Sequence, residues 1–387
     1  MKISIGHAVE GDNFFGREKE LKRMTESWQN KAAGIFIPGP RRIGKTSLVK
    51  EFIRRNKDQY KFVYFDLEGR YSIVELCKDL MKEIDSTFPK FIKAKGDFSE
   101  KWNKIHKMVS EIEIGKLIKV KTGELTKTLK EMTDKMEDIF AELYRENFII
   151  AFDEFSDFLL NLKKNSPDEV KFFLEWMRRL RQQAKIRLII TGSINIIFTI
   201  EELNFPYLIN DMADVEILPL EAVEIRALLT DLLKDKNITL SDEVLNFSVE
   251  KLSDGIPFYI QLFADGLGFY TGGDRHIDDL MEIRKLYERI TSKSHKEFID
   301  LHSRLKTNLP GPDYNAARKI LANTCHKPMS FDDLYPYIES ILPDKTAVNK
   351  LLKRLSDECY LKKEAGEYGF VSTMLADWWK NYYEYER

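Results

Sequence analysis

The run from Gly39 to Thr46 constrains the fold of this chain more than any other segment. It has the sequence Gly-Pro-Arg-Arg-Ile-Gly-Lys-Thr and matches G-x-x-x-x-G-K-[ST], the pattern of a loop whose backbone N–H groups surround phosphate oxygens. The apolar run 34–38 predicts a buried strand before the loop, and apolar residues at helical spacing over 47–53 predict a helix after it. A strand, a glycine loop and a helix in this order indicate a binding site for a nucleoside triphosphate. The alternative is a glycine-rich turn that holds no ligand.

The residues of such a loop have expected roles in binding phosphate and Mg²⁺. Lys45 is expected to reach the β- and γ-phosphates, and the hydroxyl of Thr46 is expected to bind Mg²⁺. The N-terminus of the following helix adds positive potential. The predicted phosphate-binding residues of this segment are Gly39, Pro40, Arg41, Arg42, Gly44, Lys45, Thr46 and Ser47.

Composition narrows the class of protein. With 387 residues, 43% of them hydrophobic, the chain has room for two or three globular domains. The longest apolar stretch, 188–200, is interrupted by polar residues and too short to span a bilayer, and the N-terminus has no signal-peptide core, so we expect a cytoplasmic protein without membrane contact. Cys77, Cys325 and Cys359 lie far apart, so neither disulfides nor zinc are expected. The net charge of −2 provides no global field for nucleic acid.

Short apolar runs alternate with amphipathic helices from residue 34 to about residue 218, which predicts an α/β fold with a parallel sheet. Strands are expected at 34–38, 62–67, 148–152, 187–191 and 215–218. A Lys- and Glu-rich insertion at about 90–138 is expected to contain a β-hairpin at 111–120 and a helix at 125–143.

The pattern changes after Pro219, where strands are expected to stop. A small helical domain is predicted, with helices at 221–233, 241–252, 257–267 and 278–305. Three further helices at 314–323, 330–338 and 345–357, followed by a two-stranded ribbon at 360–363 and 368–371, predict a winged helix-turn-helix. The expected domains are therefore a core at 1–218, a helical lid at 219–305 and a winged helix at 306–387.

Polar residues follow two of the predicted strands. The strand 148–152 ends in Asp153 and Glu154, and beside a phosphate loop Asp153 would hold Mg²⁺ through water while Glu154 orients or deprotonates the attacking water. The alternative is a buried strand that merely meets an acidic loop. The strand 187–190 is followed by Thr191 and Ser193, and either hydroxyl is a candidate sensor of the γ-phosphate, although hydroxyls also end strands for ordinary turn reasons.

Six short motifs occur in order along the chain. They are Phe15-Gly16-Arg17-Glu18, the loop at 39–47, Phe152-Asp153-Glu154-Phe155, Thr191-Gly192-Ser193, Pro219-Leu220-Glu221-Ala222 and Gly255-Ile256-Pro257-Phe258-Tyr259. Together they resemble the archaeal-type ATPases of the AAA+/STAND group, relatives of the origin-recognition ATPases. The resemblance covers about residues 12–265 and implies an ATPase core, a helical lid and a terminal winged helix, with ATP driving a conformational switch.

The resemblance also implies contacts to the base. Phe15, Gly16 and Arg17 match the segment that lies against the adenine, and Gly255 and Pro257 match the lid segment that closes over it. The alternatives are a simple helix start and an ordinary helix-breaking turn. Many AAA+ proteins carry a sensor arginine in the lid, and 253–257 has none, which fits the STAND-like branch.

The predicted winged helix has two candidate classes of partner. Its third helix would expose Lys345, Asn349, Lys350 and Arg354 and would bury Val348, Leu351, Leu352 and Leu355. The segment from Asp313 onward carries eleven Lys and Arg against twelve Asp and Glu, which is less basic than a DNA-binding unit usually is. Both DNA and a protein are therefore candidate partners.

Three hypotheses follow. The first is an ATP-binding and ATP-hydrolysing molecular switch, with Lys45, Asp153 and Glu154 as catalytic residues and Mg²⁺ at Thr46 and Asp153. Self-association through the ATPase cores would let an arginine at 178, 179 or 181 act on a neighbouring subunit; alternatively, these arginines complement the C-terminal end of a helix. The second hypothesis is an ATP-regulated DNA-binding regulator or initiator with slow turnover. The third is a signalling scaffold that multimerises on ATP.

Overall fold

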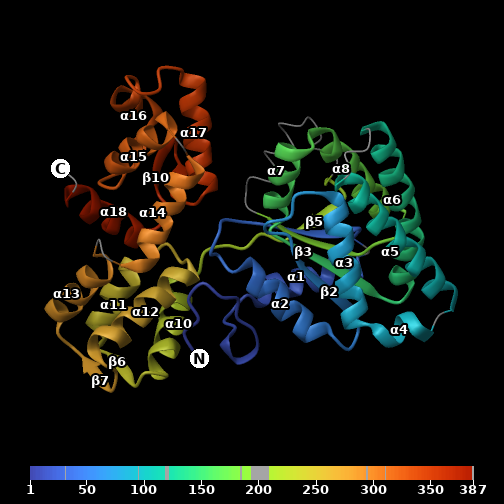
Figure 1. Cartoon of the computed structure of the whole chain (residues 1–387). Helices are drawn as coiled ribbons and strands as arrows, with labels where there is room; N and C mark the ends of the chain where they lie inside the picture. Colours follow the sequence, from blue (N-terminus) through green and yellow to red (C-terminus); the bar gives the residue numbers. More distant parts are fainter. Residues whose placement is uncertain are drawn as a thin grey trace. The chain divides into compact units, whose positions relative to one another are not determined.

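The computed structural model of the chain, drawn in Figure 1, describes residues 1–30, 32–94, 96–117, 122–183, 185–192, 209–292, 295–309 and 311–385. The chain divides into two compact units. The sheet unit comprises Arg17–Gly39 and Lys45–Ile217, and the helical unit comprises Met1–Gly16, Pro40–Gly44 and Leu218–Arg387.

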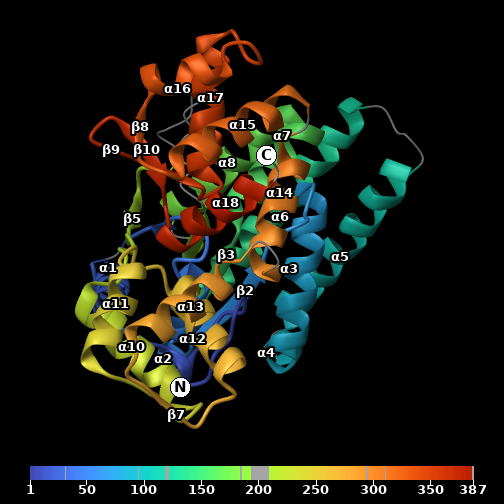
Figure 2. The same cartoon turned by 90° about the vertical axis from the view of Figure 1, so that its left-hand side faces the viewer.

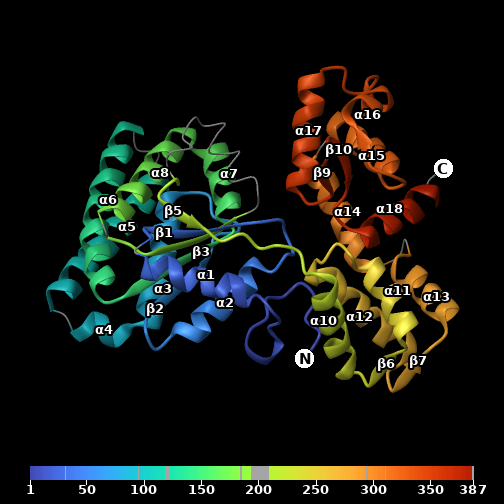
Figure 3. The ribbon, with the colours of Figure 1, turned by 180° about the vertical axis from the view of Figure 1, so that it is seen from behind.

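A five-stranded parallel sheet forms the centre of the sheet unit (Figures 1 and 3). Its strands are β1 (Gly34–Pro38), β2 (Lys61–Asp66), β3 (Phe148–Asp153), β4 (Leu188–Gly192) and β5 (Met212–Asp214), in the order β2-β3-β4-β1-β5. Every residue of β3 and β4 is buried, as expected for parallel strands that helices cover on both faces. The predicted α/β fold with a parallel sheet is confirmed.

The fifth strand lies earlier in the chain than the sequence predicts. β5 pairs with β1 over Met212–Asp214, so the prediction of a strand at 215–218 is wrong. Pairing extends one residue further, through a hydrogen bond of 2.8 Å from the Val215 N–H to the carbonyl oxygen of Phe36. In this register the chain then comes opposite Pro38, which has no N–H to donate, and the ladder stops.

The helices of the sheet unit are α1 (Glu18–Gln29), α2 (Lys45–Asn56), α3 (Ile73–Thr87), α4 (Pro89–Ala94), α5 (Gly96–Leu117), α6 (Thr122–Arg145), α7 (Phe155–Asn165) and α8 (Pro167–Gln182). α5 and α6 lie side by side and form the insertion (Figure 2). The helix predicted at 125–143 is confirmed within α6, whereas the β-hairpin predicted at 111–120 is wrong, because α5 continues to Leu117; residues 118–120 lie outside the described residues. α5 buries Phe98, Trp102, Ile105 and Val109 at helical spacing, and a helix that has begun lengthens easily.

The N-terminal segment of the helical unit contains η1 (Gly11–Asn13). The lid part contains α10 (Ala222–Lys234), α11 (Asp242–Lys251), α12 (Pro257–Thr271), α13 (Leu280–Ile290) and α14 (Lys296–Asn308) (Figure 3). Two predictions are wrong here. Strands do not stop after Pro219, because β6 (Ile238–Leu240) pairs in parallel with β7 (Arg275–Ile277); strands of three residues are too short to show alternation. The helix predicted at 278–305 is two helices, since α13 ends at its C-cap residue Thr291, whose hydroxyl bonds back to the Tyr287 carbonyl.

The C-terminal part of the helical unit is a winged helix-turn-helix, as predicted. It contains α15 (Pro312–Thr324), β8 (Met329–Ser330), α16 (Phe331–Ile338), α17 (Lys345–Asp357), β9 (Leu361–Glu364), β10 (Glu367–Phe370) and α18 (Thr373–Tyr385), with β8-β10-β9 as an antiparallel sheet (Figure 2). On α17 the predicted faces are confirmed: the residues predicted to be exposed are exposed, namely Lys345, Asn349, Lys350 and Arg354, and those predicted to be buried are buried, namely Val348, Leu351, Leu352 and Leu355.

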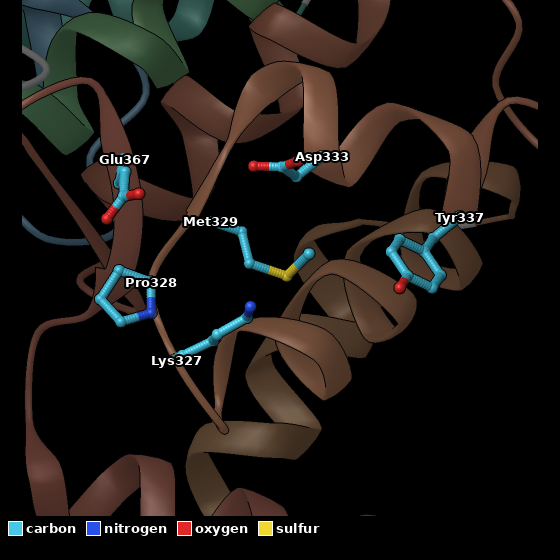
Figure 4. Close-up of a pocket in the computed structure, with 6 residues that line it drawn as sticks. All are labelled: Lys327, Pro328, Met329, Asp333, Tyr337 and Glu367. Carbon is cyan, nitrogen blue, oxygen red and sulfur yellow. The ribbon is translucent and has the colours of Figure 1, made fainter.

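A pocket of about 510 Å³ lies beside β8 (Figure 4). It is lined by Lys327, Pro328, Met329, Asp333, Tyr337 and Glu367. The side chain of Asp333 also accepts a hydrogen bond of 2.6 Å from the Ser330 hydroxyl at the start of α16. None of the predicted nucleotide-binding residues lines this pocket.

Candidate active site

The residues at the carboxyl ends of β1, β3 and β4 gather at one edge of the sheet. β4 lies between β1 and β3, and the carboxyl ends of parallel strands share one edge. Gly39 follows β1, Asp153 closes β3, and Thr191 lies near the end of β4. The predicted helix after the glycine loop is α2, which begins at Lys45.

Lys45 lies folded back over the start of the loop. Its side chain is buried, and its ammonium donates a hydrogen bond of 2.9 Å to the carbonyl oxygen of Gly39. A buried ammonium needs acceptors, and phosphate oxygens are stronger acceptors than a carbonyl oxygen. From this position Lys45 can exchange the carbonyl for a phosphate.

Asp153 is the centre of the site. It is 3% exposed, and its Oδ2 accepts a hydrogen bond of 2.6 Å from the Thr46 hydroxyl on α2. The Thr191 hydroxyl on β4 donates to Oδ1 of the same carboxylate. The structure therefore brings Thr46 and Asp153, the two residues predicted to hold Mg²⁺, into direct contact, with the candidate sensor Thr191 on the other carboxylate oxygen.

Tyr64 on β2 also reaches Asp153, and sequence reasoning assigned it no role. Its hydroxyl donates a hydrogen bond of 2.6 Å to Oδ2 of Asp153. Burial, together with the negative charge of Asp153, raises the pKa of Tyr64 above its ordinary value, so the phenol stays protonated and acts as a donor. The available signal was a single phenol within the otherwise apolar segment Phe62–Phe65 of this strand.

Glu154 makes the turn from β3 into α7. Its backbone is left-handed, with φ 50° and ψ 39°, and its N–H donates to Oδ1 of Asp153 at 3.1 Å and to Oγ1 of Thr191 at 3.3 Å. Such a conformation is costly for a residue with a side chain, and residues held this way gather at functional sites. The contacts at the ends of β3 and β4 thus fix the backbone position from which the Glu154 side chain extends.

The other predicted nucleotide-binding residues are distributed over both units. Gly16 and Arg17 have left-handed φ values of 64° and 68°. Arg17 occupies the N-cap position of α1, and its guanidinium pairs with Glu20 at 3.1 Å. Phe15 is half-buried in the helical unit, and Pro257 occupies the first turn of α12. The loop residues Pro40 and Gly44 belong to the helical unit and Ser47 to α2, whereas Ser193 lies outside the described residues.

Arg41 and Arg42 make contacts within the helical unit that the sequence did not predict. The Arg41 N–H donates a hydrogen bond of 3.0 Å to Sγ of Cys359. The Arg42 guanidinium lies 3.9 Å from the centre of the Phe258 ring, and its backbone has a left-handed φ of 72°. A guanidinium over an aromatic face is held by the ring quadrupole.

Two of the candidate finger arginines have partners inside the sheet unit. Arg179 donates to Glu137 at 2.6 Å, and Arg181, whose side chain is 1% exposed, pairs with Asp211 at 2.8 Å. A finger has to reach a neighbouring subunit, which a buried and paired guanidinium does not do. For Arg181 in particular, the geometry favours a structural ion pair over a finger.

The described parts of the chain show neither a protein metal cage nor a membrane span. Among them, no group of three or more His, Cys, Asp and Glu side chains is placed to hold a metal ion. No described helix combines the length and the hydropathy needed to cross a bilayer.

Comparison with known proteins places these residues in a family context. A model of the ATPase domain found predominantly in Archaea matches residues 14–263. An uncharacterised ATP-binding protein of Pyrococcus abyssi is 44% identical over 57 residues, which make up 14% of this chain and 17% of that protein.

Two solved structures share the fold over nearly the whole chain. A Walker-type ATPase of Pyrococcus abyssi has a TM-score of 0.63 at 20% identity, covering 98% of this chain and 100% of that one. The ORC2 protein of Aeropyrum pernix, solved in ADPNP–ADP complexes, has a TM-score of 0.57 at 13% identity, covering 97% of each chain. At these identities the likeness shows the fold alone.

The family match extends over more than half of the chain and includes both the glycine loop and the acidic end of β3. It confirms the resemblance to archaeal-type ATPases that the six motifs indicated. The chain belongs to the family of ATPase domains found predominantly in Archaea, and it is a P-loop ATPase.

Proposed function

We propose that this P-loop ATPase binds ATP with Mg²⁺ at the carboxyl edge of its sheet, hydrolyses it, and uses the nucleotide state to switch its lid and winged helix. The observation that supports the site most strongly is the hydrogen bond of 2.6 Å from the Thr46 hydroxyl to Asp153. These residues are 107 positions apart, and each was predicted on separate grounds to hold the same ion.

The oxygen atoms of this pair suit Mg²⁺. The ion keeps several waters and is usually held by one or two protein oxygens together with substrate phosphates. Thr46 and Asp153 offer one hydroxyl and one carboxylate, and the described ranges contain no group of three or more His, Cys, Asp and Glu side chains that could hold a metal ion. When bound, the ion would neutralise charge that develops on the phosphates.

The chain's own residues supply the remaining chemistry. Lys45 leaves the Gly39 carbonyl and binds phosphate oxygens, which stabilises negative charge in the transition state. Glu154 accepts a proton from the attacking water as the general base. The Thr191 hydroxyl donates a hydrogen bond to the Asp153 carboxylate and accepts one from the Glu154 N–H, so it fixes the positions of these two acidic residues relative to each other.

The identity of the nucleotide as ATP rests on the family and on the relatives that are described as ATP-binding. Phe15, Gly16, Arg17 and Pro257 are the proposed contacts to the base. The two consecutive left-handed residues at 16 and 17 turn the chain sharply into α1. Ser193 is a further proposed phosphate contact.

Coupling to the winged helix is supported by the way α18 is attached to the lid within the helical unit. Asp377 accepts hydrogen bonds from the Tyr287 hydroxyl at 2.7 Å and from the Lys251 ammonium at 3.1 Å. The ring of Trp378 stacks on Phe298 of α14 with centroids 5.5 Å apart. α18 belongs to the winged helix and packs on helices of the lid. A lid that changes position when nucleotide binds would therefore move the winged helix with it.

Glu154→Gln tests the proposed hydrolysis. The variant should bind ATP as the wild type does but release phosphate about 10²–10⁴-fold more slowly, because it lacks the general base. Glu146→Gln is a matched control, since Glu146 precedes the opposite end of β3 and pairs with Lys61 at the surface. Phosphate release at the wild-type rate in Glu154→Gln would refute the catalytic assignment. Light scattering of this variant with ATP and Mg²⁺ tests self-association in the same experiment.

A second candidate function is ATP-regulated DNA binding, which the exposed face of α17 favours. Lys345, Lys350 and Arg354 are exposed together with Asn349. If these residues enter a major groove, binding of a short duplex should weaken steeply with salt and should differ between ATP and ADP. Duplex binding that is absent at low salt would leave a protein as the partner of this surface, as in a scaffold that multimerises on ATP.

A further inference from the structure

Tyr64 is the one aromatic hydroxyl found in contact with the carboxylate at the end of β3, among the residues that the structure describes. We propose that Tyr64 is a positioning residue for magnesium binding, which acts by holding the Asp153 carboxylate in the orientation that the ion requires. This inference rests on the proposed function of the same site.

The Asp153 carboxylate is held from several sides. Oδ2 accepts hydrogen bonds of 2.6 Å from both Tyr64 and Thr46. Oδ1 accepts from the Thr191 hydroxyl and from the Glu154 N–H. Of the three hydroxyls, Thr46 is the proposed ligand of the ion, and Thr191 already fixes Oδ1. Tyr64 is therefore the hydroxyl that keeps Oδ2 in place without itself being a proposed metal ligand.

The position of the phenol is determined by the elements that carry the site. Tyr64 lies opposite Ala151 in the β2–β3 pair, two residues before Asp66 meets Asp153. Val63 and Phe65 are buried, so Tyr64 points to the opposite face of the sheet. On that face α2 supplies Lys50, whose ammonium lies 5.2 Å from the centre of the Tyr64 ring.

The same helix carries Thr46, so β2 and α2 together fix the distance between the phenol and the proposed ligands. Phe62, the next residue on this face of β2, contacts Phe52 of α2 edge-on with ring centres 6.1 Å apart. A phenol held in this way loses little freedom when the ion binds.

The expected effect follows from the behaviour of groups that orient metal ligands. Removing such a partner typically lowers metal affinity about 10–100-fold, because the ligand then samples orientations that the ion cannot use. Tyr64→Phe deletes a single oxygen atom and leaves the ring in its packing. Tyr60→Phe is the matched control, because Tyr60 lies just before the same strand and its hydroxyl accepts a bond of 3.4 Å from the adjacent Gln59.

The experiment measures binding rather than turnover. A fluorescent ATP analogue is bound to the full-length protein in EDTA and then titrated with Mg²⁺, and the Mg²⁺ concentration at half-maximal tightening is recorded. In Tyr64→Phe this concentration should rise about tenfold or more, while affinity in EDTA stays at the wild-type value. Tyr60→Phe should match the wild type throughout.

Two results would overturn the inference. One is an unchanged Mg²⁺ requirement in Tyr64→Phe. The other is an equal loss of nucleotide affinity with and without Mg²⁺, accompanied by a lower unfolding temperature, which would assign Tyr64 a structural role. If Mg²⁺ does not tighten nucleotide binding in the wild type either, the proposed function itself is wrong, and the inference about Tyr64 is wrong for the same reason.

Discussion

Replacing Gly255 with alanine should loosen the start of lid helix α12 far more than the same replacement of Gly272 at its other end. Both glycines have left-handed backbones, with φ values of +63° and +77°. They differ in their surroundings. A Cβ at Gly255 would lie 2.2 Å from the carbonyl oxygen and 2.6 Å from the nitrogen of Leu220, whereas a Cβ at Gly272 meets nothing within 4 Å.

The two variants differ in free energy because the two glycines have different neighbours. A left-handed residue with a side chain costs about 1–2 kcal/mol, and both variants bear this cost. At Gly255 the Leu220 backbone must also move, which costs about 1–3 kcal/mol as overpacking and weakens one hydrogen bond worth about 1 kcal/mol. That bond is the 2.8 Å contact from the Leu220 N–H to the Gly255 carbonyl. Gly255→Ala should therefore destabilise α12 by about 2–4 kcal/mol more than Gly272→Ala.

Hydrogen exchange of the α12 amides in the full-length protein measures this difference directly, because it reports the free energy of opening one element. The exchange rate should rise much more in Gly255→Ala than in Gly272→Ala. Since Gly255 shapes the segment before the proposed base contact Pro257, nucleotide affinity should also fall more in Gly255→Ala. Equal loss of protection in the two variants would refute the steric argument and leave backbone strain as the whole effect.

Three other perturbations have defined outcomes. Asp377→Asn removes the charged acceptor of the Tyr287 hydroxyl and should weaken the attachment of α18 by about 1–2 kcal/mol, seen as faster hydrogen exchange in that helix. Asp211→Ala leaves the buried guanidinium of Arg181 without its carboxylate and should cost about 3–5 kcal/mol in urea unfolding; a loss within experimental error would contradict a buried pair. Burial raises the pKa of Glu137, but hydrogen bonds from its lysine and arginine partners outweigh this, so the net shift is downward from 4.5. The ionised Glu137 carboxylate therefore stabilises the fold above that pH, and this contribution is lost as the pH falls. Glu137→Gln should lower the free energy of unfolding at pH 7 and should make that free energy fall less steeply on acidification. Unfolding curves at several pH values measure both effects.

Local patterns in the sequence predicted the elements that carry the proposed site. The apolar run at 34–38 is β1, the helix after the glycine loop is α2, and the apolar run ending at Asp153 is β3. Each of these is specified by neighbours in sequence, through an apolar stretch, a glycine or a change from period 2 to period 3.6. For the same reason, the three helices and the ribbon of the winged helix were predicted to within a few residues.

The wrong predictions concern segments whose local pattern allows two structures. The stretch 215–218 alternates like a strand but comes opposite Pro38, and pairing cannot continue there. Residues 111–117 contain a glycine and suggested a hairpin, yet they extend α5, which buries an apolar stripe against the core. In both cases the secondary structure is determined by a packing partner that lies elsewhere in the chain.

The sequence by itself determined that this chain has a phosphate loop between a strand and a helix, an acidic strand end, and a terminal winged helix, because such features depend on residues a few positions apart. The tertiary structure alone decided that Thr46, Tyr64 and Thr191 meet on Asp153, since their contacts join positions 107, 89 and 38 residues apart in the chain. It also decided that Arg181 is a buried ion-pair partner of Asp211, which a helix-end position does not reveal. The physical reason is the same in both cases: backbone conformation responds to neighbouring residues, whereas hydrogen bonds between side chains require strands and helices to be brought together in three dimensions.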